Sequence, residues 1–111
     1  MAYEIVNVAS AQSLSADFTS ATIDARYYQH VTIQLIWTGT PTGNFTIEVS
    51  NDEGPIPTNW VTVASSTQAA GGAAGSKNYE PSGGYAWYRV FYDSSSSTGT
   101  LTANACLKGF Y

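Results

Sequence analysis

Side chains that could perform catalysis are scarce in this sequence. His30 is the only histidine, and it stands beside Tyr27 and Tyr28 at the start of a predicted strand, a position typical of a surface or edge residue rather than of a general base. Cys106 is the only cysteine, so no internal disulfide can form. Because unpaired cysteines are usually buried, we interpret Cys106 as a small core or edge residue of the last predicted strand.

The carboxylates show no spacing that indicates chemistry. Glycoside hydrolysis needs two carboxylates flanking one bond, and the 8 Asp and Glu residues lie in loops or singly on strands. Asp52, Glu53 and Asp93 could offer oxygens to Ca²⁺, which takes about six to eight ligands, but no calcium-loop pattern is present. We favour an Asx-type turn at Asn51 and Asp52. We therefore predict no catalytic residue, no metal, no cofactor and no enzymatic activity.

Aromatic residues are in surplus. The chain holds 3 Trp, 8 Tyr and 4 Phe, more than a small core needs, so we expect several at the surface. Tyr and Trp favour interfaces and sugar stacking because each combines a large apolar area with a hydrogen-bonding tip. The interface candidates are Tyr27, Tyr28, Tyr88, Tyr92, Phe110 and Tyr111. An alternative for Tyr88 and Tyr92 is that they cover the outside of a sheet.

The charge balance excludes some partners. Only 11% of the residues are charged and the net charge is −4, a polar, weakly repelling surface that suits either close packing against neighbours or an ordinary small β domain. Four scattered cations cannot form the basic footprint that nucleic acid requires. The first residues lack a signal-peptide pattern, and the apolar stretch from Val31 to Trp37 is too short to span a bilayer. We expect synthesis in the cytoplasm and no membrane partner.

Period-two alternation is the strongest structural signal. In His30–Thr38 the residues Val31, Ile33, Leu35 and Trp37 share one face, and in Asn44–Ser50 the residues Phe45, Ile47 and Val49 do the same. The intervening Gly39–Gly43 has turn composition, so we predict an antiparallel hairpin. We predict a second strand pair within Tyr85–Lys108, formed by Tyr85–Tyr92 and Thr100–Lys108. In Tyr85–Tyr92, Trp87, Arg89 and Phe91 alternate with Tyr88, Val90 and Tyr92.

Weaker strands and long polar loops fill the rest of the chain. The strands are predicted at Tyr3–Val8, Ser13–Phe18, Ala21–Ala25, Trp60–Ala64 and Lys77–Glu80. The loops are predicted at Asn51–Asn59, Ser65–Ser76 and Asp93–Gly99. Many short strands separated by turns predict a single all-β domain over residues 1–111, an antiparallel two-sheet β-sandwich that is jelly-roll-like. A small β-barrel is the alternative.

Several segments together resemble small virion structural proteins of tailed and marine bacteriophages. The similarity covers Leu14 to Lys108. The segments that carry it are Ile23–Tyr27, Val31–Gly43, Phe45–Asp52, Asn59–Val61, Ala86–Val90 and Ser97–Leu101.

This resemblance implies a β-sandwich component of the virion that carries no catalytic residues. It implies a capsid decoration or cement protein that contacts the major capsid protein and forms homo-oligomers. The alternative is a tail or fibre component that binds host glycans.

Overall fold

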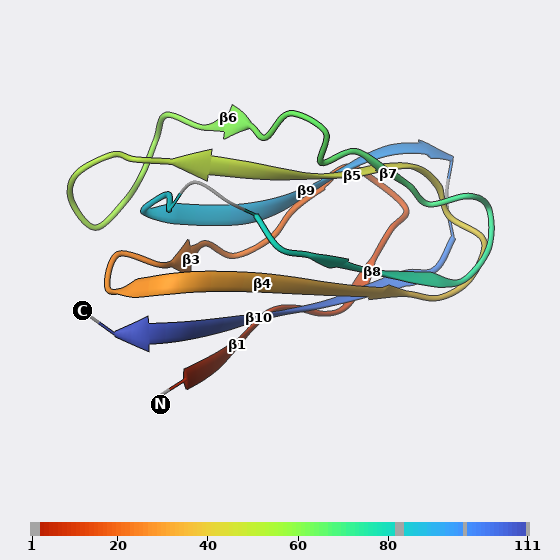
Figure 1. Cartoon of the computed structure of the whole chain (residues 1–111). Coiled ribbons are helices and arrows are strands. Elements are labelled where there is room, and N and C mark those ends of the chain that lie inside the picture. The colour runs from red at the N-terminus through yellow and green to blue at the C-terminus, as the bar shows by residue number, and fades with distance from the viewer. Residues whose placement is uncertain (1–2, 82–83, 97, 111) are drawn as a thin grey trace.

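The chain forms a sandwich of two antiparallel sheets (Figure 1). The computed structural model describes residues 3–81, 84–96 and 98–110, the side chains of 96 and 110 excepted, and its regular elements are strands. No helix in this described part of the chain is long and apolar enough to cross a membrane. The predicted fold class, an all-β antiparallel two-sheet sandwich, is confirmed.

The four-stranded sheet has the order β1-β10-β4-β8. Its strands are β1 (Tyr3–Ser13), β10 (Thr100–Phe110), β4 (Tyr28–Trp37) and β8 (Gly75–Tyr79). The first and last strands of the chain pair directly, with Tyr3 opposite Lys108. β1 carries two register shifts between Asn7 and Gln12, and bulges of this kind let one long strand follow the twist of its neighbour.

The six-stranded sheet has β9 (Trp87–Ser96) and β5 (Thr42–Ser50) at its centre. Beside β9 lie β2 (Phe18–Thr19) and β3 (Ile23–Asp24), and beside β5 lie β6 (Val61–Thr62) and β7 (Gln68–Ala69). If each short pair is counted as one interrupted strand, the strand order is that of a jelly roll, and the chain changes sheet at every connection except the one from β5 to β6. The two sheets remain separate in the described chain, so the barrel alternative is wrong.

Both predicted strand pairs are wrong, although the strands themselves exist. β4 belongs to the four-stranded sheet and β5 to the six-stranded sheet, and β9 and β10 are divided in the same way (Figure 1). Consecutive strands pair or neighbour each other only about two-thirds of the time. Alternation reveals which side chains face the core but leaves the hydrogen-bonding partner open, and here each short connection crosses from one sheet to the other.

The two crossing connections touch each other. A Cβ on Gly99 would lie 2.0 Å from the Thr38 carbonyl oxygen, and Gly99 has a φ of +102°, which only glycine adopts without strain. The Thr38 and Thr100 hydroxyls form a 2.8 Å hydrogen bond, and the Thr40 and Thr98 hydroxyls form another of 2.9 Å. Turn-forming residues therefore serve here to lock two crossovers together.

Inward alternation is confirmed along β4 and β5, whose predicted apolar faces are buried. Three aromatic rings join the two sheets: Trp37 lies 4.8 Å from Phe45, and Phe45 lies 4.9 Å from Tyr92, between ring centroids. Cys106 is half-buried and faces away from this core, opposite Ile5 and Thr32. It therefore lies on a central strand, neither in the core nor at a sheet edge.

Element ends differ from those predicted. β1 continues past the predicted end at Val8 to Ser13, and the predicted strand Ser13–Phe18 is wrong, since residues 14–17 connect β1 to β2. β9 continues into the predicted loop at residues 93–99, and β7 lies inside the predicted loop at residues 65–76. The extended part of β9 is rich in serine, a residue common in turns. It continues as a strand because Ser94 and Ser96 lie in register with β5.

Candidate functional site

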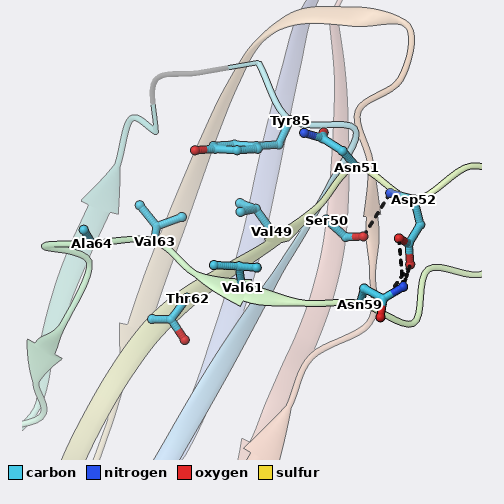
Figure 2. Close-up of a pocket in the computed structure, with 10 residues that line it drawn as sticks. All are labelled: Val49, Ser50, Asn51, Asp52, Asn59, Val61, Thr62, Val63, Ala64 and Tyr85. Carbon is cyan, nitrogen blue, oxygen red and sulfur yellow. Dashed lines mark hydrogen bonds between the residues drawn. The ribbon is translucent and has the colours of Figure 1, made fainter.

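An open pocket of about 590 Å³ lies where β5 ends and β9 begins (Figure 2). Apolar side chains make one part of its lining, and Ser50, Asn51, Asn59 and the carboxylate of Asp52 gather at one end (Figure 2). The lining residues are Val49, Ser50, Asn51, Asp52, Asn59, Val61, Thr62, Val63, Ala64 and Tyr85.

The loop after β5 is closed by one carboxylate. Asp52 Oδ2 accepts hydrogen bonds from the backbone N–H groups of Thr58 (2.7 Å) and Asn59 (2.8 Å), and the Asn59 side-chain amide also donates to Asp52. These donors hold the pKa of the Asp52 carboxyl below its usual value, the backbone N–H of Asn59 contributing most. The predicted loop is present and Asp52 shapes it, but not through an Asx turn, because the bonds that Asp52 accepts come from six and seven residues further along the chain rather than two.

Two further hydrogen bonds anchor this loop to the start of β9. The Ala86 backbone N–H donates to Asn51 Oδ1 (2.9 Å), and Trp87 Nε1 donates to the Asp52 backbone oxygen (3.1 Å). The Trp87 side chain is itself buried. These two bonds hold the polar end of the pocket against the segment that begins β9.

Tyr85 forms the aromatic wall of the pocket and is held by a core residue. Its ring stands edge-to-face on Tyr88 with centroids 6.0 Å apart, and its backbone N–H donates to the Tyr88 hydroxyl at 3.2 Å. Tyr88 is only 1% exposed, and this burial raises the pKa of its phenol. A fixed ring of this kind can contact a ligand at low cost in conformational entropy.

The opposite wall of the pocket includes Val61, an apolar residue that the facing sheet does not cover. Val61 pairs with the buried Val49, so both lie on the inner side of the six-stranded sheet, yet Val61 is 67% exposed. An inward-facing valine would ordinarily be covered by the facing sheet. The sandwich is therefore open at this corner, and the pocket is the space that results.

The outer side of the six-stranded sheet carries two arginine–aromatic stacks. Arg89 forms a 2.6 Å ion pair with Glu48 and lies 4.1 Å from the centre of the Trp60 ring. Arg26 forms a 2.8 Å ion pair with Asp24 and lies 4.5 Å from the Trp87 ring centre. The Arg26 guanidinium lowers the pKa of the Asp24 carboxyl. Each arginine is engaged by a carboxylate and an aromatic ring, and these contacts stabilise the sheet surface.

The outward positions of the four-stranded sheet form a different surface, here called the outer four-strand face. It combines exposed apolar side chains with amides and hydroxyls, and none of its described residues is a carboxylate. Its members are Tyr3, Ile5, Asn7, His30, Thr32, Gln34, Ile36, Ser76, Asn78, Thr102, Asn104, Cys106 and Lys108. Tyr3 and Ile5 are each 63% exposed.

The predicted interface residues differ in exposure and do not form one surface. Tyr27 is exposed and contacts Arg26, with 5.7 Å from the guanidinium to the ring centre. Tyr28 is half-buried, and its hydroxyl donates to Glu4 at 3.1 Å. The backbone of Phe110 pairs with Tyr28. The Phe110 side chain and the whole of Tyr111 lie outside the described residues.

Tyr88 and Tyr92 are the corrections among these candidates, since their exposed fractions are 1% and 0%. They face the core because Arg89, on the opposite side of β9, pairs outward with Glu48. A strand side that carries arginine is the solvent side, so the sequence held the signal. Neither tyrosine can contact a partner or cover the outside of the sheet.

Sequence reasoning also missed residues that the fold leaves accessible. Ile36 is an exposed apolar residue on the polar side of β4, and its place among Thr32, Gln34 and Thr38 was a usable signal. Tyr85 and Val61 had no such signal because their importance depends on the open corner. Among the described residues, no three His, Cys, Asp or Glu side chains lie close enough together to hold a metal ion.

Comparison with solved structures places this fold beside two classes of protein. One is chitosan-binding module 1 of a chitosanase/glucanase from a Paenibacillus species, with a TM-score of 0.53, 21% identity, and coverage of 94% of this chain and 92% of that one. Another is the structure of infectious bursal disease virus, Gx strain, with a TM-score of 0.52 and 12% identity, covering 96% of this chain and 31% of that one.

A third similar structure is the Tobacco streak virus coat protein, with a TM-score of 0.50, 10% identity, and coverage of 97% of this chain and 87% of that one. No protein-family model matches the sequence, and no curated protein matches it either. The chain is thus a jelly-roll β-sandwich of the kind found in viral capsid proteins and carbohydrate-binding modules. At these identities the likeness establishes the fold alone.

Proposed function

We propose that this protein is a non-enzymatic structural component of a bacteriophage virion, a capsid decoration or cement protein that contacts major capsid subunits. The phage origin rests on the sequence resemblance. The observation that supports a docking role is the outer four-strand face, which gathers exposed Tyr3, Ile5 and Ile36 on one side of one sheet.

Binding through this face carries a small desolvation cost. Burying an unpaired charge is far more costly than burying a hydroxyl or an amide that finds a hydrogen-bonding partner, and this face has no carboxylate among its described residues. Its lysine, Lys108, is exposed near the end of β10, where a long side chain can keep its ammonium group in water. The acidic side chains that give the net charge of −4 lie elsewhere, for example Asp24 and Glu48 on the other sheet. Apolar contacts at the exposed isoleucines would then supply a favourable term.

Self-association belongs to the same proposal. β1 is an edge strand of the four-stranded sheet, and it carries Tyr3 and Ile5, two of the most exposed large apolar side chains. An uncovered edge strand offers backbone donors and acceptors to another strand, so contacts between copies on a particle can use this edge while the face contacts the capsid.

Particle occupancy tests the docking role. Ile5→Lys and Ile36→Lys place a charge in the face without removing a core contact, and Thr19→Lys is the matched control because Thr19 is exposed and pairs with Phe91 on the outer side of the other sheet. Copies per purified virion, counted by quantitative mass spectrometry, should fall at least about tenfold for the two isoleucine variants, a change of about 1.4 kcal/mol in binding, and stay unchanged for the control.

Full occupancy by folded Ile5→Lys and Ile36→Lys proteins would contradict the docking role. The copy number of the unaltered protein also decides its place. Hundreds of copies per particle agree with a head decoration protein, whereas a handful would replace that part of the proposal with a tail or fibre component.

A further inference from the structure

We propose that the pocket between Tyr85 and Val61 is a binding site for a neutral pyranose sugar. This inference goes beyond the virion role and holds equally for a head or a tail location. It rests on the shape of the pocket, on the hydrogen-bonding groups at its polar end and on the absence of cationic side chains among its lining residues.

The apolar part of the pocket has two facing walls. The Tyr85 ring lies on one side, and Val49, Val61 and Val63 lie on the other (Figure 2). Val61 is the most accessible of the three valines, because the facing sheet does not cover it. A pyranose presents C–H groups on its ring faces, and such a face packs against an aromatic ring on one side and aliphatic groups on the other.

The polar part presents hydrogen-bonding groups whose orientation is fixed by the fold. Asn51 accepts from the Ala86 N–H through Oδ1, so its side-chain nitrogen lies on the Tyr85 side of the pocket as a donor (Figure 2). Asn59 donates through its side-chain nitrogen to Asp52, so its Oδ1 remains an acceptor. These assignments follow from the neighbours, since an N–H needs an acceptor and a carboxylate needs a donor.

The charge of the lining selects against ionic ligands. None of the ten lining residues is Lys, Arg or His, and Asp52 is the only carboxylate. Both Asp52 oxygens already accept hydrogen bonds from the loop. An anionic ligand therefore meets no cation, and a cationic ligand meets a carboxylate already engaged. A neutral sugar has hydroxyl groups that can use the donor of Asn51 and the acceptor of Asn59.

The site is pre-organised but open, which sets the expected strength of binding. The bonds to Asp52 fix the polar end, the Tyr88 contact fixes the Tyr85 wall, and pairing with β5 holds the backbone of Val61, so little ordering is required on binding. One aromatic ring and a few hydrogen bonds to a small ligand give dissociation constants on the order of millimolar. We expect tighter apparent binding when many copies on one particle meet a multivalent glycan.

Nuclear magnetic resonance titration of the ¹⁵N-labelled full chain tests the inference. The probes are the methyl glycosides of glucose, galactose, mannose and N-acetylglucosamine, with glucosamine and glucuronate as charged comparisons. At least one neutral glycoside should shift backbone amide signals of residues 49–52, 59–64 and 85 saturably. Tyr85→Ala should weaken that binding at least about tenfold, whereas Tyr27→Ala, at an exposed tyrosine outside the pocket, should leave it unchanged.

Val61→Arg is a second variant that tests the pocket even if Tyr85→Ala does not fold. Val61 is largely exposed, so a long side chain there fills the pocket without removing a core contact, and it should abolish binding in a protein with an unchanged fold. The inference is overturned if no neutral glycoside shifts the pocket signals at about 50 mM, a bound taken from the weak affinity expected of so small a ligand. Saturable shifts confined to other residues, or binding of a charged sugar tenfold tighter than its neutral counterpart, would also overturn it.

Discussion

Replacing Tyr92 tests the core assignment most directly, because the sequence alone predicted a surface position for it. The Tyr92 side chain is fully buried, its ring contacts Phe45, and its hydroxyl donates to the Thr42 backbone oxygen. Tyr92→Ala should therefore leave a cavity between the sheets. Truncation of a buried aromatic residue to alanine costs about 3–5 kcal/mol, a large part of the 5–15 kcal/mol that is usual for a domain.

A second substitution divides that loss into its parts. Tyr92→Phe keeps the ring and removes only the hydroxyl that donates to Thr42, so it should cost about 1 kcal/mol, the usual net value of one hydrogen bond. Tyr27→Ala is the surface control, because Tyr27 is 62% exposed. Substitutions at exposed sites usually change stability by less than about 0.5 kcal/mol.

Urea unfolding at neutral pH, followed by tryptophan fluorescence, measures all three variants. Trp37 belongs to the same aromatic cluster through Phe45, so its emission reports on this part of the core. The expected order of destabilisation is Tyr92→Ala, then Tyr92→Phe, then Tyr27→Ala. A loss below about 0.5 kcal/mol for Tyr92→Ala, within the range of surface substitutions, would refute the assignment of this residue to the core.

Two further predictions concern the connections and the pocket loop. Gly99→Ala should destabilise the protein by at least about 2 kcal/mol more than Gly54→Ala in thermal or urea unfolding, because backbone strain and clashes rank among the largest mutational effects. Both glycines have positive φ. Of the two, only Gly99 would bring the new Cβ against a backbone atom, the Thr38 oxygen. Equal losses would show that the two crossovers do not touch. The pKa of Asp52 lies below its ordinary value of 3.8, so the stability that this clamp adds is present above that value and is lost as the pH falls through the lower folded-state pKa. A carboxyl titration followed by nuclear magnetic resonance should show this midpoint, and one at or above 3.8 would contradict the clamp.

Residues close together in sequence gave the reliable predictions. The spacing of Val31, Ile33, Leu35 and Trp37 established the buried side of β4, because successive side chains of a strand point to opposite faces whatever the strand pairs with. The same reasoning applied to Phe45, Ile47 and Val49. The loop Asn51–Asn59 could likewise be predicted, and the hydrogen bonds that Asp52 accepts from the backbone stay within it.

The burial of Tyr88 and Tyr92 was predicted wrongly, although the sequence contained a signal for it. Both sides of β9 carry aromatic residues, so hydrophobicity alone left its inner side ambiguous. Arg89 indicated the outer side, and its ion pair with Glu48 on the neighbouring strand confirms it. The sequence contained the correct answer, but only the charged residue and not the aromatic count carried it.

The sequence by itself determined that the chain is built of strands, which residues of β4 and β5 face inward, and that residues 51–59 form a loop. Tertiary structure decided that β4 and β5 belong to different sheets, that the first strand pairs with the last, and that the corner beside Val61 stays open. The reason is physical: side-chain alternation is a property of one extended segment, whereas pairing and coverage depend on contacts between segments that can lie more than a hundred residues apart, such as Tyr3 and Lys108.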